Sequence, residues 1–459
     1  MVGYATIIFV LLSAISFFLA PMTYSKPFCV WELVSFGLAG VLFLQHKIRR
    51  NGIICFDTFF IPTFFLINYA HAVFIYPDDE FLPAFQFVTN TNLIPYALAV
   101  AQLGVAFYML GNILFEREQT ETHTLLKFDI PEMAVNRCAL LSLACSTGLF
   151  IFVYVLRLAR TFQHLYPRLM TMFLCIIALS WFFHAQVLAP EDHNIRGMLR
   201  KNKLNILSTV LFCFSQLFIG SRGVVIFLLF MLLLLVHTYY YKVRLKVLLP
   251  AMFIGLVLMG FLAIIRVSPY NLASVNILEA IQYGSEVVME SPSILWLLLT
   301  DFVVNAKTLY DGVDYAHVNG YLMGTSYVQY IFVFLPMGGS FFTKLLTGLD
   351  MDEVRTGNIL TRFSDATYGL GMNMVGDIYM NFSFIGVFIL MFLLGYLVAR
   401  VEIPASKYTF YAYMALFANC IYLVRADIFS WITFFVFFLI FDWMMRIHVT
   451  YDETEITTD

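Results

Sequence analysis

Arginines at the ends of apolar segments are the residues of this sequence best suited to bind a phosphate group. The guanidinium group is planar, stays charged and forms paired hydrogen bonds with phosphate oxygens. Each charge-assisted bond contributes about 1.5–3 kcal/mol. Six arginines hold such positions: Arg157, Arg160, Arg168, Arg222, Arg266 and Arg425. They predict an anion site; the alternative is that they anchor helix ends by extending their charged tips into water.

The composition is that of an integral membrane protein. Hydrophobic residues make up 61% of the 459 residues, charged residues make up 12%, and the mean hydropathy is +0.82. So little charge cannot cover the surface of a water-soluble fold. The net charge of −3 argues against a nucleic-acid partner. The cysteines and histidines follow no metal-ligand spacing, so we expect neither a metal site nor a cofactor.

Twelve uninterrupted apolar segments are long enough to cross a bilayer as helices. Such runs favour helices over the alternating strands of a membrane barrel. We therefore expect an all-α polytopic membrane protein that forms a single domain over residues 1–459. The segments are residues 4–20, 28–45, 53–75, 93–115, 137–156, 169–189, 205–220, 223–241, 245–266, 374–398, 408–425 and 427–445.

The connections between these segments alternate in charge. One set carries 16 of the 27 lysines and arginines, and the positive-inside rule places this set and both termini in the cytoplasm. The other set faces outward and includes one long segment, residues 267–373, which we expect to be an extracytoplasmic loop region. Its apolar pieces Ile294–Val304 and Val328–Pro336 are too short to span, so we expect short interfacial or re-entrant helices there.

The six arginines oppose this charge bias. Inserting an arginine near mid-membrane costs roughly 2.5–3.5 kcal/mol, and less at the membrane edge. These arginines are therefore expected to be retained for a role other than setting the topology. Arg222 lies in the turn Gly220–Gly223, where glycines permit a tight bend that exposes backbone N–H groups. We infer an outward anion site at the level of the lipid headgroups, where a lipid-linked phosphate would lie.

Four motifs resemble the bacterial O-antigen polymerases, the oligosaccharide repeat-unit polymerases known as Wzy. They are Ser221-Arg222-Gly223, Gly324-Thr325-Ser326-Tyr327, residues 371–386, and Arg425-Ala426-Asp427. Their order, together with the one long outward loop before the last three predicted spans, matches the layout of that family. The resemblance extends from about residue 205 to residue 445.

The resemblance implies a glycosyltransferase of the bacterial cytoplasmic (inner) membrane, with its active site on the periplasmic side. Such enzymes polymerise undecaprenyl-diphosphate-linked repeat units in lipopolysaccharide and other surface polysaccharide biosynthesis, and use no sugar nucleotide. Their partners would be undecaprenyl-diphosphate-linked glycans, membrane lipids and a chain-length co-polymerase.

That reaction assigns roles to the candidate residues. Five arginines would stabilise the leaving diphosphate: Arg222, Arg266, Arg425, Arg157 and Arg160. A general base would deprotonate the acceptor hydroxyl, and the candidates are Asp377, Asp301, His317 and Glu290. Tyrosines would stack on sugar rings, with Tyr327 and Tyr379 the first candidates and Tyr321 and Tyr330 further ones. The Asp350–Glu353 cluster resembles a metal-binding DxD motif, but a solvated loop explains it better.

Two other functions share these features. A lipid-linked oligosaccharide flippase would also have twelve spans and interior arginines. It should show two similar halves and short outward loops, whereas this sequence has no internal repeat and one long outward loop. An O-antigen ligase would use the same leaving group and differ in its acceptor.

Overall fold

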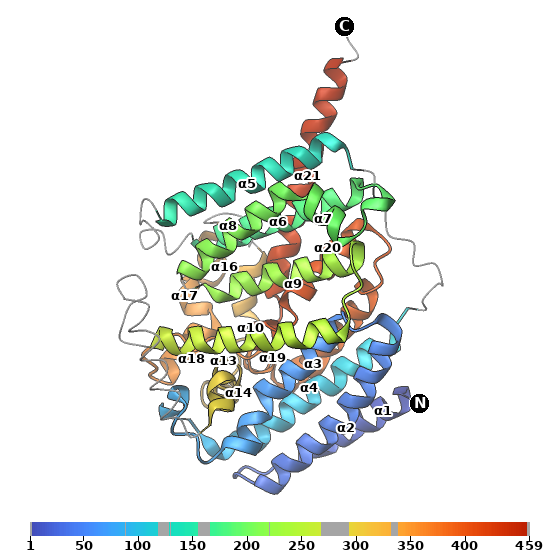
Figure 1. The fold of residues 1–459 in the computed structure, drawn as a ribbon. Helices are drawn as coiled ribbons and strands as arrows, with labels where there is room; N and C mark the ends of the chain where they lie inside the picture. The colour runs from blue at the N-terminus through green and yellow to red at the C-terminus, as the bar shows by residue number, and fades with distance from the viewer. Residues whose placement is uncertain are drawn as a thin grey trace. The chain divides into compact units, whose positions relative to one another are not determined.

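The protein is all-helical in the computed structural model, which describes residues 2–87, 89–117, 128, 130–154, 166–219, 221–267, 293–331 and 338–456 (Figure 1). No strand occurs among these residues. Thirteen of the described helices make up most of the segments predicted to span the membrane. They are α1 (Val2–Leu19), α2 (Lys26–Asn51), α3 (Phe56–Asn68), the π-helix η1 (His71–Ile75), α4 (Ile94–Leu114), α5 (Glu132–Tyr154), α6 (Tyr166–Val187), α8 (Lys203–Ile219), α9 (Arg222–Tyr239), α10 (Leu245–Val267), α19 (Met374–Val401), α20 (Lys407–Asn419) and α21 (Ser430–Ile456).

Seven helical segments among the described residues are long and apolar enough to cross a membrane. They correspond to α1, α2, α4 with the short η3 before it (Thr91–Leu93), α5, α6, α9 and α19. Apolar stretches of α3, α10 and α21 are shorter. The all-α class is therefore confirmed, whereas the count of twelve spans stays a prediction.

The long loop region contains only short helices where it is described. The first predicted apolar piece forms α12 (Ile294–Leu298) and α13 (Thr300–Val303), and the second begins with α15 (Val328–Ile331). The remaining short helices of the chain are η2 (Pro83–Gln86), η4 (Pro190–Asp192), α7 (Ile195–Lys201), α14 (Ala306–Asn319), η5 (Thr325–Tyr327), α16 (Gly338–Thr347), α17 (Met351–Val354), α18 (Thr356–Phe363) and η6 (Leu423–Arg425).

The chain divides into two compact units. The first comprises residues 1–118, 249–403 and 420–430, and the second comprises residues 119–248, 404–419 and 431–459. The single domain over residues 1–459 therefore stays a prediction.

The core of the first unit is the contact between α4 and α19. Two glycines permit it: Gly111 of α4 lies against the backbone of Phe392, and Gly395 of α19 lies against the carbonyl of Tyr108. A side chain at either glycine would overlap with the facing backbone, so this close approach requires glycine at both positions. Sixteen of the 21 residues of α4 are buried.

One buried ammonium group joins four segments of the first unit. Lys47 of α2 lies 2.6 Å from Glu402 at the end of α19, 3.4 Å from Asp57 of α3, and 3.5 Å from Glu116 just after α4. The Tyr108 hydroxyl donates a hydrogen bond to Asp57. The Lys47 side chain is fully buried, and low dielectric strengthens each of these attractions. The cluster brings together helix ends that the charge bias assigns to one side of the membrane.

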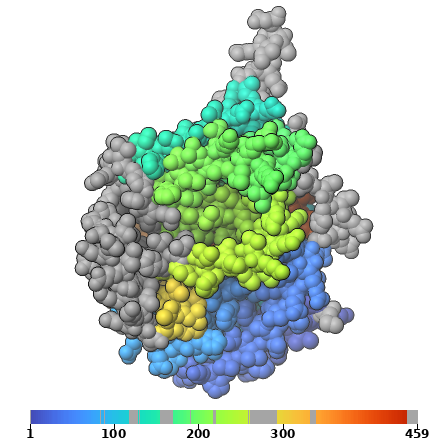
Figure 2. All heavy atoms as spheres, viewed as in Figure 1, coloured from blue at the N-terminus to red at the C-terminus, as the bar shows by residue number. Residues whose placement is uncertain are grey.

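The outer surface of the first unit is apolar along α1 and α2. Leu11 and Phe18 of α1 and Leu38 of α2 are more than half exposed. Figure 2 shows both helices at the molecular surface, in blue. A surface of this kind suits contact with lipid chains.

The second unit is held by polar contacts between apolar helices. The Ser142 hydroxyl of α5 lies 2.6 Å from that of Ser208 on α8. In the same unit Lys407 of α20 forms a 2.7 Å ion pair with Asp442 of α21. Hydrogen bonds of this kind between helices add specificity to packing that is otherwise apolar.

Replacing Gly395 by alanine is expected to destabilise the protein by about 1–3 kcal/mol, because the new methyl group would overlap with the Tyr108 carbonyl. The matched control is Gly37→Ala in α2, where the added carbon meets no atom. Alanine favours the helix there, so we expect a gain of up to about 1 kcal/mol. Thermal unfolding in detergent measures both, and a Gly395→Ala protein as stable as wild type would contradict the close packing.

Replacing Lys47 by methionine is expected to cost about 3–5 kcal/mol, because three buried or nearly buried carboxylates lose their shared counter-charge. Lys344→Met is the control, since its ion pair with Asp350 is exposed and such pairs add little. Unfolding in detergent, followed by tryptophan fluorescence, compares the two. A loss no larger for Lys47→Met than for Lys344→Met would show that the cluster does not hold the unit together.

Candidate functional site: a pair of carboxylates at the start of α19

The site lies in the first unit, where the first turn of α19 meets the segment 321–330 and the residues after η6. Asn373 caps α19, with its side chain accepting hydrogen bonds from the N–H groups of Val375 and Gly376 at 2.9 and 3.2 Å. This cap satisfies N–H groups that have no partner within the helix. It also fixes Asp377 in the first turn, where the carboxyl group is fully buried.

A break in α19 positions the neighbouring segment. Phe382 and Ser383 have non-helical backbone angles, and Ser383 has a positive φ of 61°. The break frees the carbonyls of Met380 and Asn381, which accept hydrogen bonds from the N–H groups of Leu322 and Met323 at 2.9 and 3.1 Å. Breaks of this kind are tolerated where neighbouring groups satisfy the freed carbonyls. The segment that leads to Tyr327 is thereby attached to α19.

Tyr327 fixes one oxygen of the Asp377 carboxylate. Its hydroxyl donates a 2.8 Å hydrogen bond to Oδ2, and the hydroxyl of Thr356 lies beside the same carboxylate. The other oxygen, Oδ1, is buried without a hydrogen-bond partner among the described residues. Burial raises the pKa of Tyr327 well above its usual range, and the negative charge of Asp377 adds to the shift. Tyr327 is therefore a lasting hydrogen-bond donor to Asp377.

A second carboxylate, Asp427, lies in the connection between η6 and α21 and repels Asp377 electrostatically. Tyr330 donates a hydrogen bond to Asp427. Burial raises the pKa of Asp427 above its ordinary value, while the Tyr330 hydrogen bond and the charge of Arg355 oppose that shift. Its Oδ1 is also buried without a hydrogen-bond partner in the described part of the chain. The unit thus contains two interacting acids, each with one unsatisfied oxygen.

Aromatic rings surround the two acids. The Phe429 ring packs edge-on against Tyr327 at 4.8 Å between centroids and lies 6.2 Å from the ring of Tyr330. Arg355 is exposed, with its Nε donating to Gln329 at 3.4 Å. The site therefore combines an apolar wall that excludes water with a positive charge at its edge, an environment in which electrostatic effects are strong.

Arg425 precedes Asp427 by two residues and is held by the backbone of α13. Its Nη1 donates a 3.0 Å hydrogen bond to the carbonyl of Asp301, and its guanidinium lies 5.1 Å from the ring centre of Tyr422. A carbonyl partner orients the guanidinium without neutralising it. The charge of Arg425 thus stays available to an anion.

A second group of predicted residues lies on another part of the α19 start. His317 of α14 lies 3.1 Å from the hydroxyl of Tyr379, which in turn lies 3.1 Å from the hydroxyl of Tyr96. His317 is exposed and Tyr379 is buried. The structure thus joins Asp377 with Tyr327, Asp301 with Arg425, and His317 with Tyr379.

The other predicted residues are placed only in part. Glu290, Arg157 and Arg160 lie outside the described residues, as do the side chains of Arg168 and Arg266. Arg222 opens α9 in the second unit, after the turn at Ser221. The convergence of Arg222 and Arg266 with Arg425 therefore stays a prediction.

The structure adds two residues that sequence reasoning missed. Asp427 belongs to the motif Arg425-Ala426-Asp427. Its position two residues after Arg425 gives no indication in the sequence that it lies near Asp377. Arg355 lies in the long loop region, two residues after the Asp350–Glu353 cluster, and belongs to none of the four motifs. Only its position near Asp427 connects it with the site. Among the described residues no group of three or more His, Cys, Asp or Glu is placed to hold a metal ion.

The fold and the site define an all-helical protein with seven described segments able to cross a membrane and a pair of interacting acids, of which Asp377 is fully buried. No family model, no curated protein and no solved structure matches the chain. The function is therefore inferred from the site.

Replacing Asp427 by asparagine is expected to stabilise the protein by roughly 0.5–2 kcal/mol, because it removes the electrostatic repulsion between Asp427 and Asp377. Asp365→Asn, an exposed loop residue, is the control and should change little. Thermal unfolding in detergent provides the comparison. A clear loss of stability in Asp427→Asn would mean that this carboxylate is a structural element.

Proposed function

We propose that this protein is a membrane glycosyltransferase that polymerises undecaprenyl-diphosphate-linked oligosaccharide repeat units at the outer face of the bacterial cytoplasmic membrane. The observation that carries the proposal is the buried Asp377 carboxylate, which Tyr327 orients through Oδ2 while Oδ1 has no hydrogen-bond partner among the described residues. An oriented carboxylate with one oxygen available is what a general base requires. The four sequence motifs supply the substrate class.

In the proposed reaction the acceptor hydroxyl attacks the anomeric carbon of the donor glycan. Its proton passes to Oδ1 of Asp377 as the new carbon–oxygen bond forms. The bond between the anomeric carbon and the diphosphate breaks, and its electron pair leaves with the diphosphate. Arg425, oriented by the Asp301 carbonyl, stabilises the charge that develops there.

Asp427 is a positioning residue in this scheme. Two neighbouring carboxylates repel each other, so the pair binds a proton more readily than a lone carboxylate does. The hydrogen bond from Tyr330 and the positive charge of Arg355 reduce the proton affinity of Asp427. Asp377 is therefore the acceptor of the substrate proton. The apolar outer surface of α1 and α2 is suited to the polyprenyl chains of donor and acceptor.

The test reconstitutes the purified protein in nanodiscs with a synthetic undecaprenyl-diphosphate repeat unit and resolves the products on a gel. Wild type should give a ladder. Asp377→Asn should slow polymerisation by roughly 10²-fold or more, the range for loss of a general base. Arg425→Ala should have a loss of similar size, and Arg425→Lys should recover it only in part because lysine lacks the planar fork.

Asp365→Asn is the matched control and should polymerise like wild type, since Asp365 lies in an exposed loop. A ladder from Asp377→Asn at the wild-type rate would remove Asp377 from the mechanism. Transbilayer movement of the lipid-linked unit in liposomes, with no ladder from wild type, would assign the protein to the carriers instead.

A further inference from the structure

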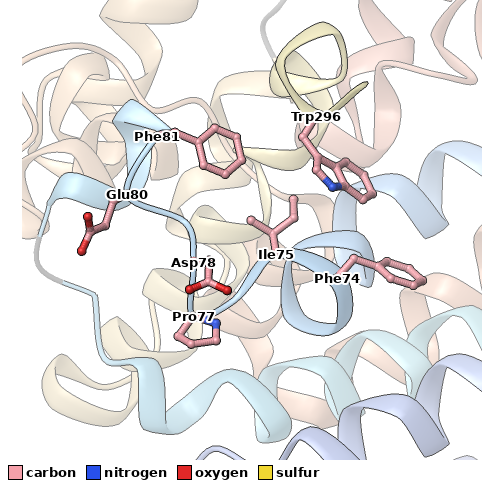
Figure 3. Close-up of a pocket in the computed structure, with 7 residues that line it drawn as sticks. All are labelled: Phe74, Ile75, Pro77, Asp78, Glu80, Phe81 and Trp296. Carbon is pink, nitrogen blue, oxygen red and sulfur yellow. The ribbon is translucent and has the colours of Figure 1, made fainter. Parts of the chain in front are cut away.

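An open groove of about 630 Å³ lies beside α12 in the first unit (Figure 3). Three aromatic rings, one aliphatic side chain and two carboxylates form most of its lining: Phe74, Phe81, Trp296, Ile75, Asp78 and Glu80. Figure 3 shows Asp78 below Phe81 and Trp296, with Glu80 at the edge. None of the lining residues that the structure describes is basic.

The aromatic side of the groove is held in place by α12. The Ser293 side chain caps this helix by accepting a hydrogen bond from the N–H of Trp296 at 3.4 Å. The Trp296 ring stacks on Phe74, with 6.1 Å between the ring centres and 24° between the planes. Trp296 and Phe81 also pack against an apolar cluster that includes buried Ile75. The ring faces are therefore fixed before any ligand binds.

The acidic side is fixed by the middle residue of the run Asp78-Asp79-Glu80. Asp79 turns inward and pairs with the buried His71 at 2.8 Å, and the His71 ring stacks on Phe85 at 3.8 Å. The other ring nitrogen of His71 lies 3.1 Å from the Tyr310 hydroxyl. Because Asp79 is anchored, Asp78 and Glu80 remain exposed at the groove. Both carboxylates therefore lie on the solvent-exposed side of the groove lining.

Flat apolar ring faces beside hydrogen-bond acceptors are the chemistry that recognises sugar rings, whose C–H faces pack on aromatic groups while their hydroxyls donate hydrogen bonds to carboxylates. Two carboxylates repel anions, and the lining residues that the structure describes include no cation to offset them. The groove therefore suits neutral or amino sugars and disfavours both a diphosphate and acidic sugars. α13 follows α12 after a single residue, Leu299, and carries the Asp301 carbonyl that holds Arg425.

We propose that this groove is a glycan subsite that selects neutral or amino sugars over acidic sugars in the lipid-linked substrate. The proposal rests on the function proposed above and specifies its substrate class. The diphosphate binds at Arg425, and the sugars of the same substrate extend along α12 and α13 into the groove. Trp296 supplies the stacking surface and Asp78 supplies the charge that excludes acidic sugars.

The experiment measures binding of two lipid-free probes of equal length, chitotetraose and tetragalacturonate, to the full-length protein in nanodiscs by isothermal titration calorimetry. Wild type should bind chitotetraose at least tenfold more tightly than tetragalacturonate. Trp296→Ala should weaken chitotetraose binding about fivefold to tenfold, the scale for losing one aromatic contact. Trp296→Phe should restore most of that loss, which separates stacking from folding.

One variant with two charge-removing substitutions tests the selectivity. Asp78→Asn combined with Glu80→Gln should narrow the preference for chitotetraose, because the groove no longer repels the galacturonate carboxylates. Trp443→Ala, an exposed tryptophan of α21, and Asp365→Asn are the matched controls and should bind like wild type.

The outcomes separate the two proposals. A wild-type ladder combined with equal binding of both probes, or with Trp296→Ala binding like wild type, would overturn the subsite and leave the polymerase standing. Selective chitotetraose binding that depends on Trp296, combined with no ladder from wild type, would support the subsite and remove the polymerase. Absence of binding to either probe would also overturn the subsite.

Discussion

The buried ion cluster around Lys47 is the constraint on which the first unit depends. A single ammonium group faces carboxylates from three other segments, and none of these acids is well exposed. In a low-dielectric interior such a group must be paired, so the ends of α2, α3, α4 and α19 have to meet. Because α19 is anchored at Glu402 and packs through Gly395 against α4, the position of its opposite end is also determined.

Near that opposite end, α19 departs from regular helical geometry, and the chemistry is proposed there. The break at Phe382 and Ser383 interrupts a helix that is otherwise continuous, and the freed carbonyls bind the segment before Tyr327. In the same region one carboxylate oxygen each of Asp377 and Asp427 has no hydrogen-bond partner within the part of the chain that the structure describes. Strain and unsatisfied polar groups reduce stability, and they occur together where the chemistry is proposed.

Sequence reasoning found residues that lie in local motifs and missed those that meet only in space. Asp377 and Tyr327 were both candidates, but their 2.8 Å hydrogen bond depends on the break in α19. Asp427 was visible in its motif, but its partner Asp377 is far away in sequence and no periodicity connects them. The acidic run at residues 78–80 looks like a solvated loop in sequence. In the structure Asp79 pairs with the buried His71, whereas Asp78 and Glu80 are exposed.

The sequence by itself determined the class of protein: 61% hydrophobic residues and long uninterrupted apolar runs require helices that satisfy their own backbone groups in a bilayer. It also predicted the approximate positions of the helices, since apolar run length is a local property, while the count of twelve spans stays a prediction. Only the tertiary structure decided which polar groups face each other. Burial and pairing arise from contacts between distant segments, such as Lys47 with Glu402 and Arg425 with Asp301, and no spacing along the chain encodes them.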